Sequence, residues 1–187
     1  MNIFLLDHDI KRCAKYHCDQ HVVKMILEST QILSTVLYLN GITSLYKPSH
    51  QKHPCVLWAG QSLQNWLWLR ELVFALNSEY KYRYDAINHK SYDVTKKLKI
   101  PSLPAIGLLE HPQVMPEEYK VLKNPVKAYR NFYIFSKSKF AVWRKRKKPN
   151  WYTKSILENN ETNEMERPTY KFGFYRAKIE NKVLFKH

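Results

Sequence analysis

One stretch of the chain has the apolar periodicity of a long core helix, and it constrains the fold more than any other feature. Between Asp19 and Leu39, apolar and small residues recur at steps of three and four: Val22, Val23, Ile26, Ser29, Ile32, Leu33, Val36 and Leu37. Residues at these steps share one face of an α-helix. Asp19 is a candidate N-cap, and Asn40-Gly41 is a typical stop signal. The pattern predicts a helix from Asp19 to Leu39.

The remaining apolar pattern predicts two further helices joined by irregular segments. A second long helix is expected from about Ser62 to Tyr84, and a third, near Pro125 to Ser136, begins with a proline that a first turn tolerates. The segment Ser44–Pro54 is rich in histidine and proline, and Lys99–Pro116 holds four prolines, so both are expected to be irregular. Asn2–Leu6 is expected to be extended. We therefore expect a mainly α protein: a single compact helical domain with a short N-terminal extended segment and irregular loops.

Length and composition are those of one domain with a tail. The chain has 187 residues, of which 44% are hydrophobic, so it can enclose a core and is too apolar for a disordered chain. The chain turns polar after Lys154, which predicts a domain at 1–154. Residues 155–187 are expected to form a polar linker and a C-terminal extension that packs back onto this domain. The unbroken apolar runs are short, so no bilayer-spanning helix and no membrane partner are expected. Three cysteines are an odd and sparse set, which favours a reducing, cytoplasmic location.

Positive charge is concentrated in one stripe near the end of the predicted domain. The net charge is +15 with histidines neutral, and eight basic residues with no acidic residue lie between Lys137 and Lys154. Aromatic residues are interleaved with these cations, which suits stacking on bases as well as phosphate binding. A solvated loop that aids solubility is the alternative. The candidate DNA contacts in this basic stripe are Arg144, Lys145, Arg146, Lys147, Lys148, Trp151 and Tyr152.

A polar face runs along the predicted Asp19–Leu39 helix. His21, Lys24, Glu28 and Gln31 are spaced by three, four and three residues, so they line one side of the helix. A carboxylate between a histidine and a lysine is a candidate acid or base whose pKa can be tuned. The ordinary alternative is the solvent-facing side of an amphipathic helix.

A second cluster has the composition of a metal site. His17, Cys18 and His21 lie close together in sequence, and His50, His53 and Cys55 follow on the loop. Imidazole and thiolate are good zinc ligands, but neither half has a standard spacing. A metal-dependent hydrolase or nuclease is therefore an alternative, and our expectation is that no metal is bound. The residues that it would use are His17, Cys18, His21 and His53.

Three motifs occur in the order found in a known family. Asp19-Gln20-His21 is followed by an acid seven positions later, at Glu28; Pro-Glu-Glu-Tyr spans 116–119; and Lys-Pro-Asn-Trp-Tyr spans 148–152. This order resembles that of the pyrimidine-dimer DNA glycosylases, of which the phage enzyme called endonuclease V is a member. The resemblance extends discontinuously from Met1 to about Lys154.

The resemblance implies a DNA glycosylase with AP lyase activity whose nucleophile is the α-amino group of the chain. The amine would attack the anomeric carbon of a damaged nucleotide and leave a Schiff base, which Glu28 would assist. His21 would contact the sugar-phosphate, and Gln20, Lys24 and Gln31 are expected DNA contacts beside it. Elimination of the neighbouring phosphate would then nick the strand. The expected partner is double-stranded DNA with a damaged or modified base, bound by a monomer without a cofactor, in the nucleoid or on viral DNA.

Two departures from the family pattern change what is expected at this site. The family's nucleophile is a small residue exposed when the initiator methionine is removed, whereas Asn2 is not small, so a retained Met1 would supply the amine. Leu27 and Gln31 stand where the family has arginines that hold the dimer site, and Lys24 replaces part of that charge. A modified or otherwise damaged pyrimidine is therefore as plausible a substrate as an ultraviolet photoproduct. A DNA-binding protein that has lost the chemistry is a further alternative.

Overall fold

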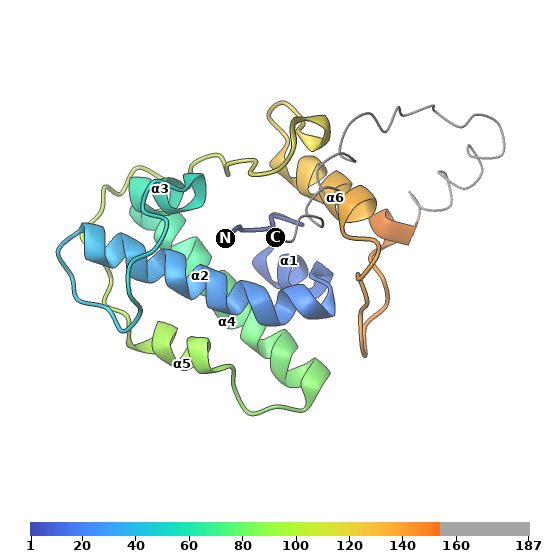
Figure 1. Ribbon diagram of the computed structural model, residues 1–187, viewed down its shortest axis with the longest axis horizontal. Coiled ribbons are helices and arrows are strands. Elements are labelled where there is room, and N and C mark those ends of the chain that lie inside the picture. The colour runs from blue at the N-terminus through green and yellow to red at the C-terminus, as the bar shows by residue number, and fades with distance from the viewer. Residues whose placement is uncertain (154–187) are drawn as a thin grey trace, which may run out of the picture.

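The computed structural model describes residues 1–153 and confirms a mainly α fold (Figure 1). Within these residues there are helices and no strand. The helices are α1 (Ile10–Tyr16), α2 (Asp19–Leu39), α3 (Pro54–Gln61), α4 (Leu63–Tyr84), α5 (Lys90–Lys97), the 3₁₀ helix η1 (Glu117–Tyr119) and α6 (Pro125–Ser136). The predicted C-terminal extension at 155–187 lies outside the described residues.

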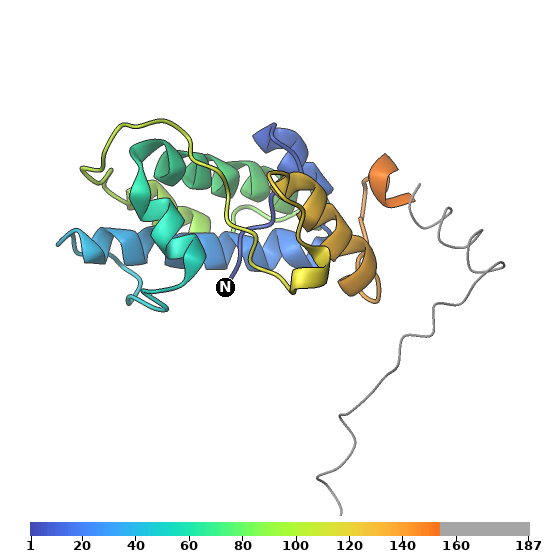
Figure 2. The ribbon, with the colours of Figure 1, turned by 90° about the horizontal axis from the view of Figure 1, so that it is seen from above.

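Helix α2 is the centre of the fold. It packs against α3, α4 and α5, and α1 packs on α4. The N-terminal segment runs through the middle of the molecule, where Ile3, Phe4, Leu5 and Leu6 are all buried. Figure 2 shows the amino terminus emerging at one face, beside α2 and α3. Because residues on both sides of Asn2 are held by packing, the start of the chain has a fixed position.

The long helices begin and end where side-chain chemistry dictates. Ser62 caps α4, since its hydroxyl accepts the amide of Asn65, and Asn40 ends α2 before Gly41, whose φ is +72°. One prediction was wrong: the N-cap of α2 is Cys18, which has no side-chain capping bond, and Asp19 is the first helical residue. The Asp19 carboxylate instead binds groups from other elements, as described below.

Helix α2 also corrects an expectation about membranes. By length and composition it could cross a bilayer, although its unbroken apolar runs are short. In the structure 61% of its most apolar window is buried inside the fold. A core helix passes the same test of length and composition, and the packing of α2 against three other helices accounts for its apolar faces.

The segment at 99–116 is irregular, as predicted, and it lies as a strap across α3, α4 and α6. Its carbonyls accept hydrogen bonds from Ser62 (at Gly107) and from the indole of Trp58 (at Leu109). Its far end reaches the N-terminal segment at Val114. This strap therefore joins the α3–α4 corner to the start of the chain.

Candidate active site

The start of the chain lies against one carboxylate of α2. The Met1 amino nitrogen is 3.8 Å from Glu28 Oε2, and the Asn2 backbone N–H donates to the same oxygen at 2.8 Å. The other carboxylate oxygen is 3.5 Å from the Lys24 ammonium, one turn earlier on α2. The Glu28 side chain is 12% exposed. The site therefore combines an amine and a carboxylate in contact, at a position that is partly screened from solvent.

The Asn2 side chain fixes the position of the amine. Its amide nitrogen donates to Val114 O at 2.8 Å, and its oxygen accepts the Ile3 N–H at 2.8 Å and the Tyr129 hydroxyl at 3.0 Å. Burial raises the pKa of Tyr129, so its hydroxyl keeps the proton that it donates. The residue that differs from the family pattern is thus held by three elements.

The loop before α3 reaches the same point. Cys55 Sγ is 3.9 Å from Asn2 Oδ1, which brings the start of α3 to the amine. Burial raises the pKa of Cys55 to about 12, so the thiol is neutral and is not a prepared nucleophile. His53, two residues earlier, caps α3 and lines an open hollow formed by residues 48–53. The sequence placed His53 and Cys55 in a possible metal cluster, whereas the structure places them beside the chain terminus.

His21 does not reach the solvent beside Glu28. Its ring is buried between Phe4 and Phe140, and its Nδ1 is hydrogen-bonded to the Tyr133 hydroxyl. Burial lowers the pKa of His21 to about 3, so the ring is neutral. The prediction that His21 shares the polar face of α2 and contacts the sugar-phosphate is therefore corrected: His21 belongs to the core that supports the N-terminal segment.

The metal-site alternative has no geometric support. In the described part of the chain no group of three or more His, Cys, Asp or Glu side chains could hold a metal ion. His17 is buried, with its Nδ1 bonded to the Cys13 carbonyl, and Cys18 and Cys55 are buried free thiols. The two halves of the sequence cluster serve different parts of the core.

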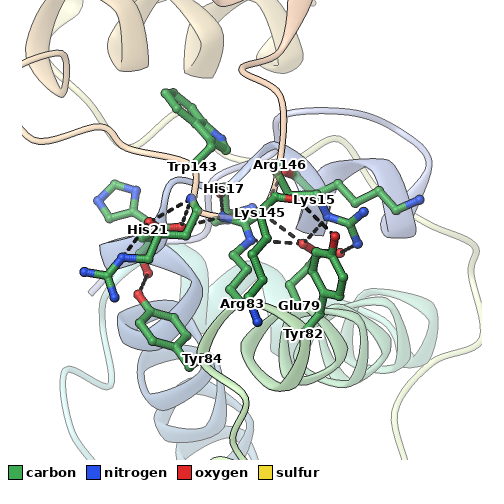
Figure 3. A network of polar contacts seen from close by, with 12 residues as sticks. Lys15, His17, His21, Glu79, Tyr82, Arg83, Tyr84, Trp143, Lys145 and Arg146 are labelled. Carbon is green, nitrogen blue, oxygen red and sulfur yellow. Dashed lines mark hydrogen bonds and ion pairs between the residues drawn. The ribbon is translucent and has the colours of Figure 1, made fainter.

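Arg83 is the centre of a buried polar network (Figure 3). Its side chain is fully buried and pairs with Asp19 at 3.1 Å and with Glu79 at 3.0 Å. The same guanidinium donates to the backbone carbonyls of His17 at 2.8 Å and Lys15 at 2.9 Å. It therefore ties the end of α1 and the start of α2 to α4.

The basic stripe docks on this network, which changes its expected role. Three of its residues reach acidic partners: the Arg144 amide donates to both oxygens of Asp19, Lys145 pairs with Asp85 at 2.6 Å, and Arg146 binds Glu79 with two hydrogen bonds. Lys147 and Lys148 are exposed. The structure therefore pairs Arg146 with a buried carboxylate and Lys145 with an exposed one, leaving fewer unpaired charges of the stripe for phosphates than the sequence suggested.

The stripe and the amine are separated along α2. Asp19, which anchors the stripe, precedes Glu28 by nine residues, equivalent to about 14 Å along the axis and half a turn around it. Positive charge at the site comes instead from Lys24, whose ammonium is 3.5 Å from Glu28. Burial is the main cause that lowers the pKa of His21, and the positive charges of Lys137 and Lys24 lower it further, so Lys137 lies on the His21 side of α2. Lys137 was counted in the stripe but was not among the predicted site residues.

The remaining predicted DNA contacts differ in how far they are exposed to solvent. Gln20 is exposed and Gln31 is half-buried on α2. Tyr152 is buried against Trp143 and so is not a contact surface. Trp151 is half-buried, with the Arg130 guanidinium 5.3 Å from its ring centre.

Comparison with known proteins agrees with the motifs. Residues 1–92 match the family model described as pyrimidine dimer DNA glycosylase. No curated protein and no solved structure matched the chain. The matched region contains the amine, Glu28, His53 and the first four helices, whereas Val114 and Tyr129, which hold Asn2, lie outside it. Residues 1–92, just under half of the chain, are thus similar to the pyrimidine dimer DNA glycosylases, which agrees with the order of the sequence motifs.

Proposed function

We propose that this protein excises a damaged or modified pyrimidine from double-stranded DNA through a Schiff base with its N-terminal amine, and then cleaves the abasic strand. The observation that carries the proposal is the contact between the chain terminus and Glu28, with the amine at 3.8 Å and the next backbone nitrogen at 2.8 Å.

In this proposal the chemistry is divided between the amine and one carboxylate. The amine attacks C1′ of the flipped nucleotide, the bond to the base breaks, and loss of the ring oxygen bond leaves an iminium ion. Glu28, on a rigid helix, stabilises this cation and moves protons to and from the sugar. Lys24 and Lys137 supply positive charge for the phosphates on either side, without the arginines of the family pattern.

We propose the amine of Met1 as the nucleophile, because the Met1 side chain is 3% exposed and packs against the core. If the methionine is removed in the cell, the Asn2 nitrogen is already 2.8 Å from the carboxylate and takes the same role. The intact mass of the purified protein distinguishes these cases. The protein is proposed to act as a monomer in the cytoplasm, on nucleoid or viral DNA.

Borohydride trapping tests the proposal. The purified chain is mixed with duplexes that contain an abasic site, a uracil or an ultraviolet photoproduct, and the reductant converts any Schiff base into a stable adduct. We expect an adduct mapped by peptide mass to the first residue. Glu28→Gln should bind DNA but lose base release by about 10²-fold or more, whereas Glu71→Gln, at an exposed position of α4, should behave as wild type.

Tight DNA binding without an adduct on any of these duplexes would contradict the proposal. That result would favour a protein that keeps the scaffold and the DNA affinity but has lost the chemistry. An adduct on a lysine side chain would equally contradict the assignment of the terminal amine.

A further inference from the structure

His53 is held in one orientation by the backbone of α3. It is the N-cap of that helix, and its Nδ1 accepts the backbone N–H of Cys55 at 3.2 Å. Because Nδ1 must accept this bond, it carries no proton, and the neutral ring keeps its one proton on Nε2. The Nε2–H group is therefore a hydrogen-bond donor whose direction is set by a helix cap.

One contact and one electrostatic effect place the His53 end of α3 beside the active site. The thiol of Cys55, in the first turn of the helix that His53 caps, is 3.9 Å from the Asn2 side chain. Burial is the main cause that lowers the pKa of His53. The positive charges of the terminal amine and of His50 lower this pKa further, and the negative charge of Glu28 raises it. The ring therefore lies close enough for both charged groups of the site to act on it, and the function proposed above leaves it without a role.

The side of His53 away from the core is open. His53 lines a hollow together with His50 and Lys52, formed by residues 48–53. Lys52 is exposed and His53 is half-buried. A cation and a neutral N–H donor at the edge of an open hollow are suited to a phosphate oxygen.

We propose that His53 is a further catalytic residue, which donates its Nε2–H to the phosphate that leaves C3′ of the abasic sugar during strand cleavage. The inference deepens the function proposed above and depends on it. In this step Glu28 takes a proton from C2′, the C2′–C3′ double bond forms in conjugation with the iminium ion, and the C3′–O bond breaks. The bonding electrons go to the phosphate oxygen, and no oxidant or reductant is needed.

A neutral donor suits this step better than a charged one. The departing oxygen gains negative charge as the bond breaks, and a fixed N–H group stabilises that charge without reorganising. Lys52 adds positive charge on the same side. The donor acts only when charge develops, so it should affect elimination more than formation of the Schiff base.

The chain offers a matched pair of variants for the test. His53→Asn keeps a side-chain acceptor at the N-cap but removes the Nε2–H donor. His89 caps α5 in the same way, with its Nδ1 accepting the Ser91 amide at 3.2 Å, and His89→Asn is the control for any effect on helix capping. Each variant is mixed with a duplex holding a preformed abasic site, and strand cleavage and borohydride trapping are measured in single turnovers.

We expect His53→Asn to slow strand cleavage by about 10- to 100-fold, in the range seen for loss of one transition-state donor, with trapping yield unchanged. His89→Asn should match wild type in both assays. His53→Ser, which also retains a capping oxygen, should reproduce the His53→Asn result if the lost donor is the cause.

Wild-type cleavage by His53→Asn would overturn the inference. It would also be overturned if trapping and cleavage fell together, because His53 would then only support the structure of the site. Failure of the wild-type protein to form any adduct would instead refute the proposed function itself, so the two failures are distinguishable.

Discussion

The fold should lose stability steeply in mild acid because it buries three neutral histidines. Burial lowers the pKa of His17 and His111 to about 4 and that of His21 to about 3. His17 and His111 each have a buried Nε2 with no hydrogen-bond partner. A proton added to either ring would have no acceptor and would bring an unpaired charge into the core.

The sign and the size of the effect follow from proton linkage. Each histidine titrates near pH 6.5 in the unfolded chain and far lower in the folded one, so below pH 6.5 the unfolded state binds more protons. The stability contributed by each neutral ring is therefore present above pH 6.5 and lost as the pH falls toward 4. Between pH 7 and pH 5 each histidine lowers the free energy of unfolding by about 2 kcal/mol. The three together lower it by about 5–6 kcal/mol, which is comparable with the whole stability of a small domain.

Urea unfolding at pH 7, 6 and 5, followed by circular dichroism, measures this loss directly. The free energy of unfolding should fall as the pH is lowered, and His111→Gln should reduce the slope of this fall against pH by about a third. Replacing the exposed His8 by asparagine should leave the slope unchanged. A free energy of unfolding that is equal at pH 7 and pH 5 would refute the argument that these rings are buried and neutral.

Three variants test other parts of the structure. Arg83→Ala should destabilise the fold by about 3–5 kcal/mol, seen as a lower urea midpoint, because it removes the buried cation that Asp19 and Glu79 share and leaves two backbone carbonyls without their donor; a change under 1 kcal/mol would contradict the network. Replacing both Lys147 and Lys148 by glutamine should weaken DNA binding on every sequence and lower the salt slope of log K by about 2; an unchanged slope would show that they do not contact phosphate. Tyr129→Phe removes a hydroxyl that holds Asn2 and should slow base release by about tenfold or more, through misplacement of the amine; an unchanged rate would show that the hydroxyl does not position it.

The long helices could be predicted because their signals are local. The apolar steps of α2, the serine before α4 and the proline that opens α6 are each contained in a few neighbouring residues, and the structure places all three helices within a residue of the predicted bounds. The short helices α1, α3 and α5 have too few turns for periodicity to be visible. Two of them begin at histidine caps, which the standard start signals do not include.

The site could be predicted only where the motif is itself local. Glu28 and the chain terminus were identified together, but the groups that hold them come from distant segments: Tyr129 and Val114 lie more than a hundred residues from Asn2 in sequence. His21 illustrates the opposite error. Its spacing places it on the polar side of α2, but the N-terminal segment and α6 cover that side at the first turns, so the ring is buried.

The two carboxylates of α2 explain how one helix serves both the fold and the chemistry. Asp19 at its start is fully engaged by Arg83 and by the Arg144 backbone, so it anchors the helix against α4 and the basic stripe. Glu28, two and a half turns later, is bound among the described residues by the chain terminus and by the exposed Lys24, partners that it can exchange for a substrate more readily than Asp19 can. Since an α-helix between these points is rigid, the anchored end fixes where the reactive end lies. The acid that we propose supports catalysis is thereby held in place before DNA arrives, which is the condition under which a carboxylate can stabilise a cationic intermediate without first reorganising.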